Sequence, residues 1–219
     1  MTTIAAAGVM RIVTAGCAAV IAAAISSGPA FAAPSDATDA PPAGKVTVDV
    51  LTVNGSGCPA GTATTRVVAD NTGFHIAYSD FIARDGGTST PTGFRRNCQV
   101  SLQILIPQGF TLAIARADYR GRAYLVSDAS ALQRTNYYFQ GEAANNLADH
   151  TFDGPFNSAW HTTDITAAAA LVYAPCGETV ILNVNTELRV DSPRLASWIS
   201  MRSSDGDVDT LIQFSWKQC

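Results

Sequence analysis

Residues 183–191 read NVNTELRVD, and they decide the fold class because apolar residues recur at alternate positions along them. Val184, Leu188 and Val190 share one face of an extended chain, and the opposite face is wholly polar. Successive side chains of a β-strand point to opposite faces of its sheet. The stretch therefore predicts a strand with one buried and one solvated side.

The same period of two recurs along the chain. It predicts further strands at residues 45–53, 74–83, 98–106, 110–118, 122–126, 135–141, 197–202 and 211–216. Clusters of Gly, Asn, Asp and Pro separate these segments and mark turns. Many short strands at this spacing favour an all-β fold, an antiparallel two-layer β-sandwich of the jelly-roll kind, with a β-barrel as the alternative.

The first 32 residues have the features of an export signal. Arg11 supplies one positive charge, residues 12–25 are almost wholly Ala, Val and Ile, and residues 30–32 offer small residues at a cleavage site. We expect a signal peptide over residues 1–32 and a secreted, extracellular protein. The apolar run is shorter than the roughly 20 residues that a membrane span needs, and no second apolar run follows it. We therefore expect no membrane span in the mature protein.

Composition divides the rest of the chain into a tail and a domain. Residues 33–44 are rich in Ala, Pro and Asp and predict a flexible tail. Residues 45–219 suit one domain, which we expect to be monomeric. The formal net charge of −4, with arginines interspersed among aspartates, predicts no basic patch and no nucleic-acid partner.

Four cysteines follow the export signal: Cys58, Cys98, Cys176 and Cys219. An even number of cysteines in a secreted domain predicts two disulfides. Three pairings are open. We prefer Cys98 with Cys176 and Cys58 with Cys219, because the second bridge would tie the two ends of the domain together.

Catalytic residues are hard to find in this sequence. No G-x-S-x-G motif is present, and the three histidines lie in no recognisable frame. Paired carboxylates could hydrolyse a glycoside, and Glu187 with Asp118 is the pair that an extracellular hydrolase would use in a cleft. The competing interpretation places both in ion pairs with arginines on neighbouring strands.

Alternate aspartates at Asp205, Asp207 and Asp209 could supply hard oxygen ligands to calcium. The EF-hand pattern is absent, because its sixth position is Thr210 and its twelfth is Trp216. A plain acidic turn is the competing interpretation. No spacing of His and Cys indicates zinc, and we expect no other cofactor.

Aromatic residues supply the leading hypothesis for function. Exposed rings beside Asn and Arg can stack on sugar rings, and the candidate binding residues are Tyr119, Arg120, Tyr137, Tyr138 and Trp160. Neighbouring residues of a strand point to opposite faces, so at least one of Tyr137 and Tyr138 should lie in the core. We predict a non-catalytic module that binds polysaccharide or cell-wall material, with a protein-binding or inhibitory surface protein as a further alternative.

Eight segments occur in a specific order: GSGCP (55–59), FRRNCQ (94–99), IPQGF (106–110), ARADYRG (115–121), NYYFQG (136–141), PCG (175–177), NTELRV (185–190) and DGD (205–207). Together they resemble the secreted domain-of-unknown-function family 4360 of actinobacteria and filamentous fungi, over residues 46–219. The resemblance implies a small extracellular protein with four cysteines. It brings no catalytic assignment.

Overall fold

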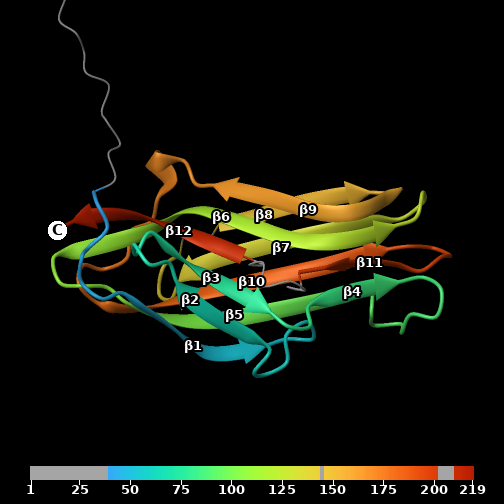
Figure 1. The fold of residues 1–219 in the computed structure, drawn as a ribbon, viewed down its shortest axis with the longest axis horizontal. Helices are drawn as coiled ribbons and strands as arrows, with labels where there is room; N and C mark the ends of the chain where they lie inside the picture. Colours follow the sequence, from blue (N-terminus) through green and yellow to red (C-terminus); the bar gives the residue numbers. More distant parts are fainter. Residues whose placement is uncertain (1–38, 144–145, 202–209) are drawn as a thin grey trace, which may run out of the picture. The chain divides into compact units, whose positions relative to one another are not determined.

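Two antiparallel β-sheets face each other across one hydrophobic core in the computed structural model (Figure 1). The structure describes residues 39–143, 146–201 and 210–219. Within these ranges, no helix is long and apolar enough to cross a membrane. The strands are β1 Thr47–Asn54, β2 Ala63–Val67, β3 Gly73–Tyr78, β4 Ile82–Asp85, β5 Arg95–Leu105, β6 Phe110–Leu125, β7 Ser130–Phe139, β8 Asn146–Asp153, β9 Phe156–Ile165, β10 Thr179–Asp191, β11 Ser197–Ser200 and β12 Thr210–Gln218, with a short 3-10 helix at Ala168–Ala170.

Sheet A has the strand order β1-β5-β10-β7-β8, and sheet B has the order β2-β3-β12-β6-β11-β4. Strand β6 organises sheet B. Its first half pairs with β12, its second half pairs with β11 on the same edge, and β9 occupies the other edge. Neither sheet closes on itself among the described strands, so the predicted sandwich is confirmed and the barrel alternative is not found.

The core lies between the two sheets and follows the predicted alternation. On sheet A, Leu182 and Leu188 of β10 are fully buried, as are the inward residues of β5. On sheet B, Ile212 and Trp216 of β12 face the core, and Phe214 packs on Phe74 with ring centroids 5.6 Å apart. Burying each such side chain stabilises the fold by roughly 1.5–3 kcal/mol. The predicted core faces of β5, β10 and β12 are therefore confirmed.

Two strand predictions differ from the structure. The segment 74–83 forms two strands, β3 and β4, because the chain turns at residues 79–81 and buries Phe81. Conversely, 110–118 and 122–126 form one strand, β6, which continues through Gly121. A Cβ at Gly121 would lie 1.9 Å from the Ser200 carbonyl oxygen and 2.4 Å from Cζ2 of Trp160. This glycine therefore permits close packing inside a strand and does not mark a turn.

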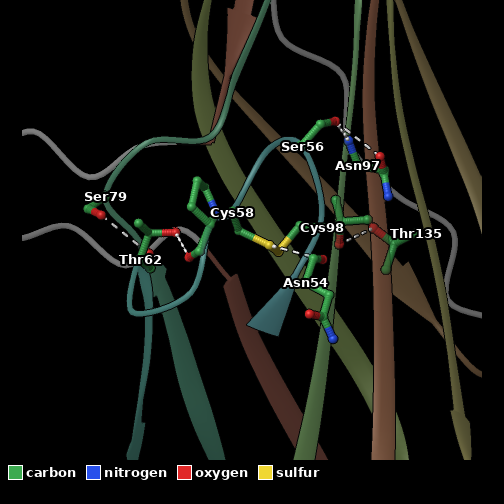
Figure 2. The surroundings of a disulfide bond; sticks show 10 residues. Asn54, Ser56, Cys58, Thr62, Ser79, Asn97, Cys98 and Thr135 are labelled. Carbon is green, nitrogen blue, oxygen red and sulfur yellow. Dashed lines mark hydrogen bonds between the residues drawn. A yellow bond between two sulfur atoms is a disulfide. The ribbon is translucent and has the colours of Figure 1, made fainter. Parts of the chain in front are cut away.

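Both disulfides differ from the preferred pairing: they join Cys58 to Cys98 and Cys176 to Cys219. The strand pairing explains the first bridge, which Figure 2 shows. Asn54 at the end of β1 is paired with Gln99 of β5, so the loop after β1 reaches Cys98, with a Cα–Cα distance of 5.3 Å across the bridge.

The second disulfide follows from the start of β6. The amide of Gly177 donates to the Phe110 carbonyl, and the amide of Cys219 donates to the Gly109 carbonyl. The two cysteines are thereby held on the same part of β6, with their Cα atoms 6.3 Å apart. The preference for Cys98 with Cys176 and for Cys58 with Cys219 was wrong because these local pairings were not visible in the sequence.

The domain begins earlier than the predicted boundary at residue 45. The Asp39 amide donates to the Trp216 carbonyl at 3.0 Å, and its carboxylate accepts a bond from the Gln218 amide at 2.6 Å. Asn71 Nδ2 donates to the Pro42 carbonyl at 2.8 Å, and Pro42 is buried. Residues 39–44, predicted as part of a flexible tail, thus belong to the domain. The predicted signal peptide lies outside the described residues.

Replacing Cys58 and Cys98 with alanine should lower the free energy of unfolding by about 4 kcal/mol, because the bridge closes a loop of 40 residues in the unfolded chain. Urea denaturation of the oxidised protein and the double variant measures this difference. The Cys176→Ala, Cys219→Ala variant, whose cysteines are 43 residues apart, should lose a similar amount. A non-reduced peptide map that links Cys98 to Cys176 would contradict the expected pairing.

Candidate ligand-binding face

Three of the five predicted binding residues lie in the core. Tyr119, Tyr137 and Trp160 are only 0%, 2% and 5% exposed. Trp160 packs over Gly121, its partner on β6, which explains the burial of so large a ring. The expectation that at least one of Tyr137 and Tyr138 lies in the core is confirmed. These three rings do not form an exposed binding strip.

The other two predicted residues lie on opposite sides of the sandwich. Tyr138 is half-buried on the outer face of sheet A, where it is paired with Asn183 of β10. Arg120 is exposed on the outer face of sheet B. A single ligand would contact only one of these faces, so Tyr138 and Arg120 do not belong to the same binding site.

A polar network occupies the interior beside the buried tyrosines. Gln133 Nε2 donates to Thr135 Oγ1 at 2.7 Å, and Thr162 Oγ1 donates to Gln133 Oε1 at 3.1 Å. Burial raises the pKa of Tyr119 well above its usual value, and the negative charge of Asp164 acts in the same direction. These groups link β7 of sheet A to β6 and β9 of sheet B.

The same interior reaches the surface between β8 and β9. His150 Nε2 lies 2.7 Å from Asp164 Oδ1 and joins the two strands. A groove of about 410 Å³ lies alongside and is lined by residues that include Tyr137, Asn146 and Thr166. Tyr137 and Thr166 bond each other through their hydroxyls at 3.1 Å, so these polar groups of the groove already serve the fold.

The proposed catalytic carboxylates lie on different faces. Glu187, on the outer face of sheet A, accepts hydrogen bonds from Arg95 Nε at 2.7 Å and from Arg189 at 2.8 Å. Burial acts to raise the pKa of Glu187, but the hydrogen bonds from both arginines outweigh it and lower this pKa.

Asp118, by contrast, lies on the outer face of sheet B. It accepts bonds from Arg116 Nε at 2.6 Å and from Thr163 Oγ1 at 2.6 Å, and His161 Nε2 lies 3.2 Å away. The hydrogen bond from Arg116 is the largest cause that lowers the pKa of Asp118 to about 2. No cleft can bring Glu187 and Asp118 together, so the hydrolase hypothesis based on this pair is wrong.

Polar groups on the outer face of sheet A bind one another, beside exposed apolar residues such as Leu105 and Leu147. Ser101 Oγ donates to Asn183 Oδ1 at 2.7 Å. The arginines of this face, Arg95, Arg134 and Arg189, each form an ion pair with a carboxylate. These three guanidinium groups therefore have little hydrogen-bonding capacity left for a partner.

The outer face of sheet B differs because aromatic and basic side chains align on it. One cross-strand row runs over β4, β11, β6 and β9 and consists of Arg84, Trp198, Tyr124 and Asn157. Tyr124 is 39% exposed, the largest exposure of any tyrosine or tryptophan among the described residues. Neighbouring strands lie about 4.8 Å apart, so the row is about 14 Å long.

Arg120 and Arg122 precede Tyr124 by four and two residues on β6 and therefore project from the same side of the strand. We name the six residues of this surface the basic aromatic face; they are Arg84, Arg120, Arg122, Tyr124, Asn157 and Trp198. Within the described part of the chain, none of its three arginine side chains forms an ion pair or a hydrogen bond. The prediction that the arginines form no basic patch is therefore wrong.

A groove of about 570 Å³ adjoins the basic aromatic face. Tyr124 and Asn157 belong both to the cross-strand row and to the groove wall, which also includes Pro155, Phe156 and Leu195. Leu195 is 62% exposed. The aromatic row thus continues into a partly apolar depression, a suitable shape for one side of an extended ligand.

Sequence reasoning identified Arg120 but missed the rest of this face. The alternation of Arg120, Arg122 and Tyr124 on one strand could have placed these three on one side. Nothing local in the sequence indicates that Trp198 lies beside Tyr124, because 73 residues separate them and only the sheet register brings them together. The candidate calcium residues Asp205, Asp207 and Asp209 lie outside the described residues.

Comparison with known proteins places the chain in a family. The family model described as "Domain of unknown function (DUF4360)" matches residues 44–219, and the chain belongs to this family. An uncharacterised secreted protein of Arthroderma benhamiae is 30% identical over 183 residues, which cover 83% of this chain and 75% of the relative. The protein is thus secreted, and its two disulfides fit an extracellular location.

One solved structure is also similar to this chain: TmCBM61 in complex with β-1,4-galactotriose. The similarity covers 80% of this chain and 88% of that chain, at 8% identity and a TM-score of 0.26.

Asp118→Asn should destabilise the protein by an amount on the order of 2 kcal/mol at neutral pH. The pKa of Asp118 is about 2 in the folded protein against a usual value of 3.8, so its ionised form stabilises the fold above about pH 4. This stabilisation is lost as the pH falls towards 2. Urea denaturation of both proteins between neutral pH and pH 2 should therefore show two curves that converge in acid.

Asp149→Asn is the matched control, because Asp149 pairs with Arg134 at an exposed site where ion pairs contribute roughly 0–1 kcal/mol. An Asp118→Asn protein as stable as the original at neutral pH would contradict the role assigned to this carboxylate.

Proposed function

We propose that this member of the DUF4360 family is a non-catalytic extracellular module that binds polysaccharide or cell-wall material on its basic aromatic face. The observation that carries the proposal is the row of Arg84, Trp198, Tyr124 and Asn157 across four strands. In this row Trp198 is half-buried and the other three residues are exposed, and the row adjoins a groove of about 570 Å³.

The chemistry of the row suits a sugar chain. A sugar ring has an apolar face, which an aromatic side chain can cover, and hydroxyl groups at its rim, which need hydrogen-bonding partners. Tyr124 and Trp198 supply the rings, and Asn157 supplies both a donor and an acceptor through its amide. With a length of about 14 Å, the row fits an extended chain better than a single small molecule.

The position of the row on strands also favours binding. β6 is hydrogen-bonded on both edges, which fixes the backbone beneath Tyr124. A ligand that meets side chains already held in place loses less free energy to the ordering of its site. The nearest acidic side chain on β6, Asp118, is occupied by Arg116 and Thr163, which supports binding without cleavage.

Tyr124→Ala and Trp198→Ala should each weaken retention on an insoluble cell-wall polysaccharide by about tenfold or more, because each removes a ring that the ligand covers. A pull-down over a series of protein concentrations, after a glycan array has identified retained polymers, measures the apparent Kd. Trp198→Phe, which keeps a ring, should lose less than Trp198→Ala.

Tyr138→Ala is the matched control on sheet A and should bind as the original protein does. Thermal unfolding of each variant confirms that the fold is intact. Loss of binding in Tyr138→Ala with full binding in both other variants would move the site to sheet A. An absence of saturable binding to every polymer would contradict the proposed function.

A further inference from the structure

Among the described residues, three arginines of the basic aromatic face have no ion-pair partner. On the outer face of sheet A, three arginines are ion-paired with Glu187 or Asp149. On sheet B, Arg116 is taken by Asp118, whereas Arg84, Arg120 and Arg122 have no such partner within the described residues. Since the chain is acidic overall, with a net charge of −4, this concentration of unpaired positive charge on one face requires an explanation.

The positive charge extends beyond β6. His75 of β3 projects from the same outer face, and its cross-strand partner on β2 is Arg66. Burial is the largest cause that lowers the pKa of His75, and the charges of Arg66 and Arg120 add to it. Arg66 and Arg120 thus act on the same histidine from two sides.

The arrangement of the arginines indicates how the negative charges of a partner would be spaced. No two of Arg84, Arg120 and Arg122 lie in the same cross-strand row. Residues two apart on a strand are about 6.6 Å apart, and Arg84 lies two strands, about 10 Å, to the side of β6. Dispersed arginines suit single charges repeated along a chain, whereas one doubly charged phosphate would need them to converge.

We infer that the basic aromatic face binds an acidic polysaccharide, one whose sugar units carry carboxylate groups. The inference rests on the proposed function and names the class of its ligand. The aromatic row of Tyr124 and Trp198 covers the sugar rings, and the guanidinium groups of Arg120, Arg122 and Arg84 bind carboxylates as bidentate donors. The face thereby selects acidic over neutral chains of the same sugar.

A matched pair of polymers tests this selection. Polygalacturonic acid and its methyl ester share a backbone and differ in charge. The full-length secreted protein should bind the acid at least tenfold more tightly than the ester at low salt, and the difference should shrink in 0.5 M NaCl, where the Debye length is on the order of 4 Å.

Arg120→Gln with Arg122→Gln should lower the affinity for the acid to that for the ester, so that the ratio of the two dissociation constants falls from at least tenfold to about one. Lys45→Gln with Arg134→Gln is the control, because it removes the same charge from the sheet A side and should keep the preference. Arg134 is part of an exposed ion pair, so its loss should not unfold the protein.

The outcomes separate the two proposals. Equal binding of acid and ester, lost only in Tyr124→Ala, would overturn the inference and leave the proposed function standing. An acid preference that the control double variant also loses would overturn the inference, because it would then report net charge alone. Displacement of polygalacturonic acid by polyphosphate at far lower charge concentration would overturn the assignment to carboxylates. Binding of neither polymer, nor of any polymer on the array, would overturn both.

Discussion

Burial of two apolar sheet faces against each other is the constraint on which the rest of the molecule depends. Once Ala117, Ala123 and Leu125 of β6 face the core, every second residue of that strand must face outward. A slip of one residue would exchange the two sets, so the core also fixes the register. Because β6 is paired on both edges, this register passes to β9, β11 and β12, and it places Tyr124 beside Trp198.

Inward and outward residues alternate in the same way in both sheets, but the outward residues of the two sheets differ in their partners. On sheet A, outward polar groups satisfy one another, as in the pairs of Ser101 with Asn183 and of Arg134 with Asp149. Such contacts between strands stabilise the sheet modestly. On sheet B, the arginines of the basic aromatic face have no ion-pair partner among the described residues. They therefore stabilise the fold through no ion pair. A partner from outside the chain would supply the carboxylates that they lack.

Local alternation made part of this structure predictable. It identified the core faces of β5, β10 and β12, and it separated Tyr137 from Tyr138 correctly. It failed for β8 and β9, because their inward residues include His150, Thr162 and Asp164, which carry no hydrophobic signal. Across the core, His150 pairs with Asp164 and Thr162 donates to Gln133, and only the folded structure reveals these partners.

Contacts between distant segments could not be predicted either, because they depend on which strands pair in the folded structure. The disulfides follow strand pairing that joins β1 to β5 and Cys219 to the start of β6, and the basic aromatic face follows pairing that joins Trp198 to Tyr124. β9 presents Asp164 to His150 on its inner side and Asn157 to solvent on its outer side. These two residues lie near opposite ends of β9, about 23 Å apart. The polar core that hid β9 from the sequence pattern therefore anchors the end of this strand that is remote from the proposed binding row.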